Sequence, residues 1–106
     1  MIIGEVIGTV VCTQKEESLN STKMLLVQPC HISSLKPESS PLVALDAVGA
    51  GIGELVLVVG GSSARNAKGY SKVTVDQSIV GIIDYIYIKD KQIYSKNEYS
   101  DNEINR

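Results

Sequence analysis

The sequence predicts a small all-β domain with five main strands and almost no helix. Apolar segments of strand length recur along the 106 residues, and polar or glycine-rich turns separate them. Aliphatic residues dominate and all five aromatic residues are Tyr, so the core should be narrow and built from Val, Ile and Leu. A chain of this length supports a single core. The strand pattern alone is compatible with a closed barrel or with a sandwich.

The first strand is predicted over residues 2–13. Apolar and polar residues alternate weakly there, with Val6 and Val10 on one face, and Gly4 and Gly8 interrupt the pattern. Two glycines on one face of a long strand indicate sharp coiling, as in a small closed barrel.

The second strand is predicted over residues 23–31, after a polar break. Residues 24–27 are apolar on both faces, whereas a sheet with one side in water alternates, so we expect cover on the outer face, for example from a neighbouring subunit. Pro29 cannot donate a ladder hydrogen bond, which places the strand end at an edge or bulge. His31 has no partner constellation and is interpreted as a surface or capping imidazole.

The middle of the chain contains two short strands, predicted over residues 42–46 and 54–59, around a glycine loop. Gly49, Gly51 and Gly53 alternate in this loop, which permits positive φ and close backbone approach. A dinucleotide site would need GxGxxG between a strand and a helix, and this spacing differs. We therefore expect the loop to lie where backbones meet, either between subunits or around an axis.

A second glycine-rich segment, GGSS, occupies residues 60–63. Its amides could cradle an anion, but Ser62 or Ser63 capping one helical turn at residues 64–67 is the favoured interpretation. In a ring of subunits, such loops near the axis would line a narrow polar opening. The candidate pore or subunit-interface residues are Gly49, Gly51, Gly53, Gly60, Gly61, Ser62 and Ser63.

The last long strand is predicted over residues 79–88, and a polar turn then lets residues 92–94 pair back as a hairpin. These elements place the domain at residues 1–94. The tail over residues 95–106 is polar and low in hydrophobicity, so we expect it to be flexible and dispensable for folding.

The titratable residues form no catalytic pattern, and we predict no catalytic residue. Carboxylates such as Asp76 have no nucleophile or base in a recognisable relation to them. Arg65 is the natural partner for Asp46 or Asp84, and these three residues are candidate interface or structural polar groups.

The two cysteines suggest neither a metal site nor a redox motif. Cys12 and Cys30 lack a CxxC spacing and a nearby second His, so we expect two small buried thiols, no metal and no cofactor. A disulfide would require their strands to pair, and the cytosol disfavours it.

The formal net charge of −2 and the scattered basic residues argue against a nucleic-acid or membrane partner. The amino terminus carries no signal-like segment, and no apolar run reaches membrane-spanning length, which makes a bacterial cytosolic location the expectation.

Three strings of the sequence carry a resemblance to a known family. They are DAVGAGIGE at residues 46–54, VLVVGGSSAR at residues 56–65 and VDQSIVGIID at residues 75–84, and the start MIIGEVIGTV also fits. Together they resemble the EutN/CcmL family of bacterial microcompartment vertex proteins.

This resemblance implies a five-stranded OB-like barrel and a structural role without catalysis. The expected assembly is a homopentamer that caps the vertices of a microcompartment shell in the cytoplasm, with hexameric shell proteins as partners. Two alternatives stay open. A single-stranded nucleic-acid-binding OB module would need stacking aromatics on a basic groove, which the sequence lacks. The other alternative is a small-molecule-binding β-barrel.

Overall fold

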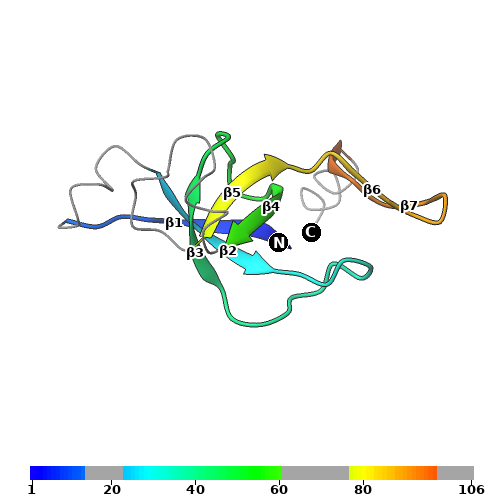
Figure 1. Cartoon of the computed structure of the whole chain (residues 1–106), viewed down its shortest axis with the longest axis horizontal. Coiled ribbons are helices and arrows are strands. Elements are labelled where there is room, and N and C mark those ends of the chain that lie inside the picture. The colour runs from blue at the N-terminus through cyan, green and yellow to red at the C-terminus, as the bar shows by residue number, and fades with distance from the viewer. Residues whose placement is uncertain (14–22, 61–76, 98–106) are drawn as a thin grey trace.

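The chain forms a β-barrel with a two-stranded hairpin attached to it (Figure 1). The computed structural model describes residues 1–13, 23–60 and 77–97. Gly61, Ser62, Ser63, Arg65, Asp76 and the expected helical turn lie outside these residues. The strands are β1 (Ile2–Val10), β2 (Met24–Pro29), β3 (Leu42–Asp46), β4 (Leu55–Gly60), β5 (Gln77–Ile82), β6 (Tyr85–Ile88) and β7 (Lys91–Ser95).

The first five strands close into a barrel in the order β1-β2-β3-β5-β4. Strand β1 pairs with both β2 and β4, and the pairing of β3 with β5 is the parallel one. A closed five-stranded barrel of this kind is OB-like, so the predicted fold class is confirmed. In the part of the chain that the structure describes, no helix has the length and apolar character to cross a membrane.

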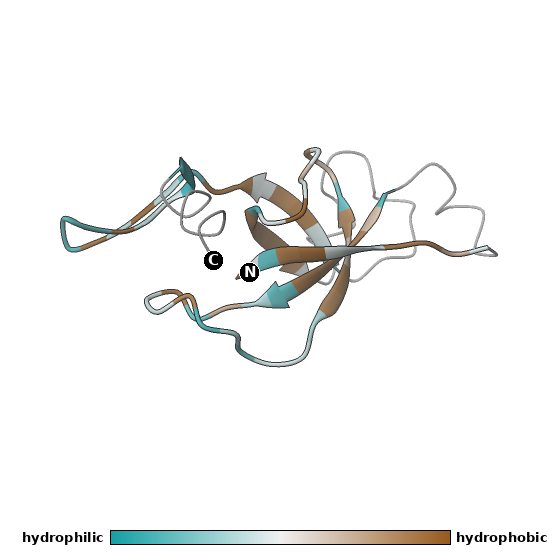
Figure 2. Ribbon diagram, turned by 180° about the vertical axis from the view of Figure 1, so that it is seen from behind, coloured by the Kyte–Doolittle hydropathy of each residue, from teal (hydrophilic) through white to brown (hydrophobic). Residues whose placement is uncertain are grey.

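The barrel interior is aliphatic, as the composition predicted. Figure 2 shows hydrophobic segments concentrated along the barrel strands. Gly4 packs closely against this interior, as a Cβ added at this position would lie only 2.5 Å from Val27 Cγ1. The fully packed cluster comprises Val6, Leu25, Val27, Ala44, Ala50, Val56, Val58 and Ile79.

A bulge in β1 overturns one expectation about this strand. The register pairs Val6 with Val27 but Gly8 with Leu26, which leaves Ile7 as the extra residue. An extra residue inverts the alternation beyond it, because directly opposed residues share a face of the sheet. The predicted common face for Val6 and Val10 is therefore wrong, and the strand ends at Val10 rather than extending over residues 2–13.

The predicted strand over residues 79–88 is wrong as a single element. Strand β5 ends at Ile82 and β6 begins at Tyr85, because the chain leaves the barrel between them. Ile83 N–H donates to Leu55 O at 2.8 Å, and Lys96 N–H donates to Asp84 O at 2.9 Å. The expected hairpin is present as β6 and β7, and β7 continues one residue beyond the boundary placed after Tyr94.

The hairpin base packs on the barrel through a second apolar cluster. Its buried members are Cys30, Leu55 and Tyr94. Burial raises the pKa of the Cys30 thiol, so this cysteine behaves as a packed apolar group. Cys12 is exposed because it follows the end of β1, and the expectation of two buried thiols is wrong for it.

Candidate functional site

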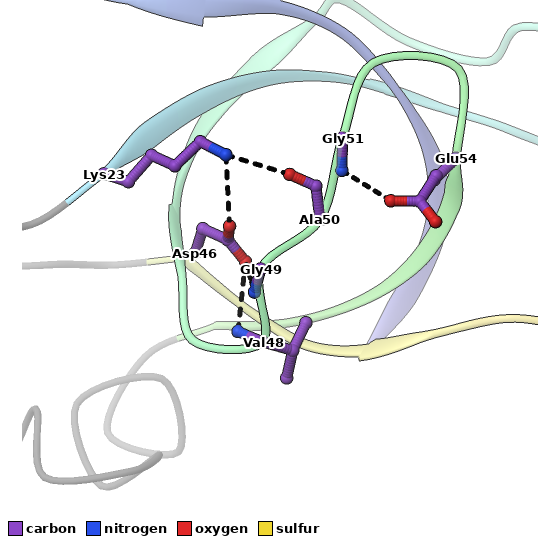
Figure 3. A network of polar contacts seen from close by, with 7 residues as sticks. All are labelled: Lys23, Asp46, Val48, Gly49, Ala50, Gly51 and Glu54. Carbon is purple, nitrogen blue, oxygen red and sulfur yellow. Dashed lines mark hydrogen bonds and ion pairs between the residues drawn. The ribbon is translucent and has the colours of Figure 1, made fainter.

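The loop between β3 and β4 is held at its start by Asp46 (Figure 3). The Asp46 side chain is 1% exposed. Its Oδ1 accepts hydrogen bonds from the backbone N–H groups of Val48, at 3.1 Å, and of Gly49, at 3.0 Å. An Asp that accepts from amides two and three residues ahead fixes a local turn. Asp46 therefore sets the direction in which the chain leaves the barrel.

Lys23 ties this turn to the start of β2. Its Nζ donates to the backbone oxygen of Ala50 at 3.1 Å and lies 3.8 Å from Asp46 Oδ2. Asp46 thus has a cationic partner in Lys23, whereas the expected partner Arg65 lies outside the described residues. Asp84 is exposed between β5 and β6.

Glu54 holds the other end of the loop and links it to the hairpin. Its Oε1 accepts from Gly51 N–H at 2.5 Å, and its Oε2 lies 2.6 Å from Lys96 Nζ. The hydrogen bond from Lys96 holds the pKa of the Glu54 carboxyl below its usual range, and Glu54 raises the pKa of Lys96. The pair joins a barrel loop to the residue that follows β7.

Sequence reasoning missed both lysines. Lys23 stands at the polar start of an apolar strand, and Lys96 lies in the segment predicted to be a tail. Only the closed barrel and the attached hairpin bring them to Asp46 and Glu54, so no local spacing could have revealed these contacts.

The three loop glycines differ in their backbone conformation. Gly49 has φ of 80° and Gly53 has φ of 90°, so these two positions require glycine for conformational reasons. Gly51 has no positive φ, and a Cβ there would lie 3.4 Å from Glu54 Oε1. Close to them Ile52 is 70% exposed, which leaves an apolar side chain at the loop tip. Gly60 ends β4 opposite Gln77.

An apolar patch is exposed on the outer face of β1, β2 and β3. Leu26 and Val43 are register partners on β2 and β3, and Leu26 also pairs with Gly8. Val43 is 47% exposed and the bulged Ile7 is 42% exposed, whereas Met24 is already buried within the chain. We call Ile7, Leu26 and Val43 the outer patch. Of the residues 24–27, which were expected to need cover from outside the chain, Leu26 is the one whose side chain is not already buried.

Within residues 1–13, 23–60 and 77–97, no group of three or more His, Cys, Asp or Glu side chains is placed to hold a metal ion. His31 is exposed, as predicted for a surface imidazole, and its Nδ1 lies 3.7 Å from Glu38 Oε1.

The sequence also matches a family model, described as ethanolamine utilisation protein EutN/carboxysome, over residues 1–84. The chain belongs to the EutN/CcmL family. Over 86 residues, this EutN/CcmL protein is 48% identical to the bacterial microcompartment shell vertex protein GrpN of Rhodospirillum rubrum (strain F11). The aligned residues cover 81% of this chain and 96% of GrpN. It is 42% identical over 98 residues to the carboxysome shell vertex protein CcmL of Nostoc sp., covering 92% of the chain and 97% of CcmL.

Solved structures show the same fold. The structure of Gloeobacter violaceus CcmL superposes with a TM-score of 0.86 at 43% identity, over 92% of this chain and 99% of that one. The GrpN pentameric microcompartment shell protein from Rhodospirillum rubrum superposes with a TM-score of 0.74 at 45% identity, over 83% and 98% of the two chains. The resemblance noted in the sequence is confirmed, and the nucleic-acid and small-molecule alternatives are not favoured.

Proposed function

We propose that five copies of this EutN/CcmL protein close into a ring that caps a vertex of a bacterial microcompartment shell. The protein is a structural shell component, and its place is the shell inside the cytoplasm. The observation that carries the proposal is the match to GrpN, a pentameric shell protein at 45% identity whose fold this chain shares over almost the whole of GrpN.

The outer patch supports a subunit contact at the β1–β3 side of the barrel. Ile7 and Val43 expose apolar side chains on a sheet face where Gly8 adds no side chain. A ring of five closes through heterologous contacts, in which one surface meets a different surface of the next subunit. Burial of this patch by a neighbour would supply the cover that Leu26 lacks within the single chain.

The glycine loop and the segment at residues 60–63 are proposed contact or axis-lining regions of the ring. Exposed Ile52 at the tip of the first loop is available to a neighbour. Asp46 and Glu54 fix this loop from both ends, so it would meet a partner already ordered and lose little entropy on assembly.

The proposed partners beyond the ring are hexameric shell proteins. Flat hexagonal tiles close into a shell only where pentagonal units occupy the corners, so a pentamer at a vertex must contact hexamers on all sides. This role requires no chemical step, and we propose that the protein acts without catalysis of its own, in keeping with its structural relatives.

Size-exclusion chromatography with light scattering tests the proposal directly. We expect one species with the mass of five chains at micromolar concentration, with each contact burying about 800 Å² or more per partner. A monodisperse monomer would contradict the ring, and a hexamer would contradict the vertex role.

A further inference from the structure

The hairpin of β6 and β7 has one face for the barrel and one face without cover. Ile86 and Tyr94 are register partners, and both pack into the second apolar cluster. Tyr85 and Tyr87 alternate with Ile86 and lie on the opposite face, where they are 58% and 60% exposed. Their ring centroids are 6.4 Å apart, so together they form a continuous aromatic surface.

This aromatic surface is large enough to matter in an interface. A buried tyrosine contributes about 150–250 Å², so the exposed parts of two such rings offer roughly 240 Å². That is about a third of the ~800 Å² that each partner buries in a stable contact. Tyrosine is also enriched in interface cores, because it combines a broad apolar ring with a polar tip.

The hairpin is held in a fixed direction before any partner arrives. The Glu54–Lys96 pair, at 2.6 Å, joins its end to the barrel loop, and Lys96 N–H donates to Asp84 O across its base. The hairpin projects from the barrel (Figure 1). A projecting element that is already ordered loses little conformational entropy when it binds a partner.

The same chain carries a concave surface that could receive such an element. A groove of about 640 Å³ runs along the start of β1, the end of β2 and the segment after it. Its lining includes Ile3, Cys30 and Leu42, with Ile32 exposed at 59%. Among the described residues that line it, Glu38 is the acidic side chain. It is half-exposed, and its Oε1 lies 3.7 Å from Nδ1 of His31, which also lines the groove, as does Met1.

Charge is complementary between the two surfaces. The hairpin turn carries Lys89 and Lys91, both exposed, around Asp90. Lys89 and Asp90 have φ of 49° and 67°, so the turn twists with the strands and presents these side chains at the tip. A lysine of the tip can therefore pair with the half-exposed Glu38 while the aromatic face covers the apolar part of the lining.

We propose that the β6–β7 hairpin of one subunit seats in this groove of the next subunit in the ring. Tyr87 covers the apolar lining near Ile32, and Lys89 or Lys91 pairs with Glu38. The proposal rests on the proposed pentamer and adds a second subunit contact to the one proposed at the outer patch. A second copy of the chain is the favoured occupant because the chain carries both complementary surfaces, as a heterologous ring contact requires.

Mixed-chain cross-linking tests this placement. In a Cys12→Ser/Cys30→Ala background, which removes both native thiols, a Tyr87→Cys chain and a size-tagged Ile32→Cys chain are co-assembled and treated with a short bis-maleimide. We expect a cross-linked species containing one chain of each kind. The matched control replaces Ile32→Cys by Thr9→Cys, which lies exposed on β1 and outside the groove lining.

The outcomes separate this inference from the pentamer itself. If wild-type chains are monomeric, the proposed ring fails, and this contact fails with it. If wild-type chains are pentameric and Ile32→Cys cross-links no better than Thr9→Cys, the hairpin placement alone is wrong. A yield at least several-fold above the control supports the placement.

Charge reversal provides an independent readout. Glu38→Lys and the double change Lys89→Glu/Lys91→Glu should each weaken assembly, and combining all three should restore most of it. Far-UV circular dichroism verifies that each variant is folded. Lys36→Glu, an exposed change outside the groove lining, should leave assembly unchanged. Additive losses without rescue would overturn the pairing with Glu38.

Discussion

At the residue scale, Gly4 illustrates how a single missing side chain permits the barrel to close. A Cβ at this position would lie 2.5 Å from Val27 Cγ1 and 3.0 Å from Gln28 O, and the second of these atoms belongs to backbone that cannot easily move. Gly4→Ala should therefore destabilise the fold by about 1–3 kcal/mol through overpacking. Chemical denaturation at fixed protein concentration measures this loss.

Gly8→Ala is the matched control for that change. Its Cβ would lie 3.7 Å from Leu26 Cβ, which is an ordinary contact, and Ala restricts the unfolded chain more than Gly does. We expect a change within about 0.5 kcal/mol of zero in the subunit. Equal losses for the two variants would refute the role assigned to Gly4.

The loop glycines separate into conformational and contact roles. Gly53 has φ of 90°, and its N–H donates to Val6 O at 2.8 Å, so Gly53→Ala should strain the fold by about 1–3 kcal/mol. Gly51 has no positive φ, so Gly51→Val should leave circular dichroism nearly unchanged and weaken the pentamer. Thermal melting and sizing separate the two effects. Normal pentamers from Gly51→Val would show that the loop is an ordinary exposed turn.

At the element scale, the Glu54–Lys96 pair makes the link between loop and hairpin sensitive to acid. Because the folded-state pKa of Glu54 is lowered, its contribution is present above the unfolded value of about 4.3 and is lost as pH falls through the folded value. Because the folded-state pKa of Lys96 is raised, its contribution to stability is present below the unfolded value of about 10.4. That contribution is lost as pH rises through the folded value. Beyond the pair itself, Asp46 acts on Glu54 and Asp84 acts on Lys96.

Glu54→Gln should lower the melting temperature at neutral pH, and the difference from wild type should shrink below about pH 4.5. Melting curves across this range, with Lys96→Met as the control for the other partner, measure the effect. Parallel curves for wild type and Glu54→Gln would show that the carboxylate contributes nothing to the link.

The carboxyl-terminal tail gives a second prediction at this scale. Residues 98–106 are polar, and their composition predicts that removing them leaves folding and ring formation intact. Truncation after Tyr94 removes more, because Ser95 closes β7 opposite Tyr85 and Lys96 pairs with Glu54. We expect truncation after Asn97 to be neutral and truncation after Tyr94 to lower stability. Loss of the oligomer on truncation after Asn97 would contradict the prediction that residues 98–106 are dispensable.

The elements differ in how far the sequence could predict them. Apolar runs and turn residues located the barrel strands, because those signals are local. The bulge at Ile7 and the break after Ile82 depend on which strand lies alongside, and single-strand alternation carries no information about a partner's register. The site shows the same limit. The sequence marks Asp46 as a candidate interface or structural polar group, but Lys23 and Lys96 reach the loop through tertiary contacts.

Across the whole molecule, the exposed apolar surfaces lie on different elements. The outer patch lies on β1 to β3, the aromatic face lies on β6, and the groove proposed to receive that face lies along the start of β1 and the end of β2. An isologous dimer would need one self-complementary patch, whereas a ring needs two different surfaces on each subunit. The arrangement of apolar surface in this subunit is therefore the kind that cyclic assembly requires.

Val43→Glu tests this arrangement at the outer patch, where Val43 is 47% exposed in the subunit. The charge is solvated in a free subunit, so the fold should survive, but a neighbour that covers the patch would desolvate an unpaired carboxylate. That penalty is on the order of 3 kcal/mol, or more than a hundredfold in affinity, for each contact. A closed ring repeats the contact in every subunit, so the penalty accumulates around the ring. Light scattering should find that Val43→Glu is a monomer, whereas the control Lys36→Glu should still form pentamers. Pentamers of Val43→Glu would place the subunit contacts elsewhere.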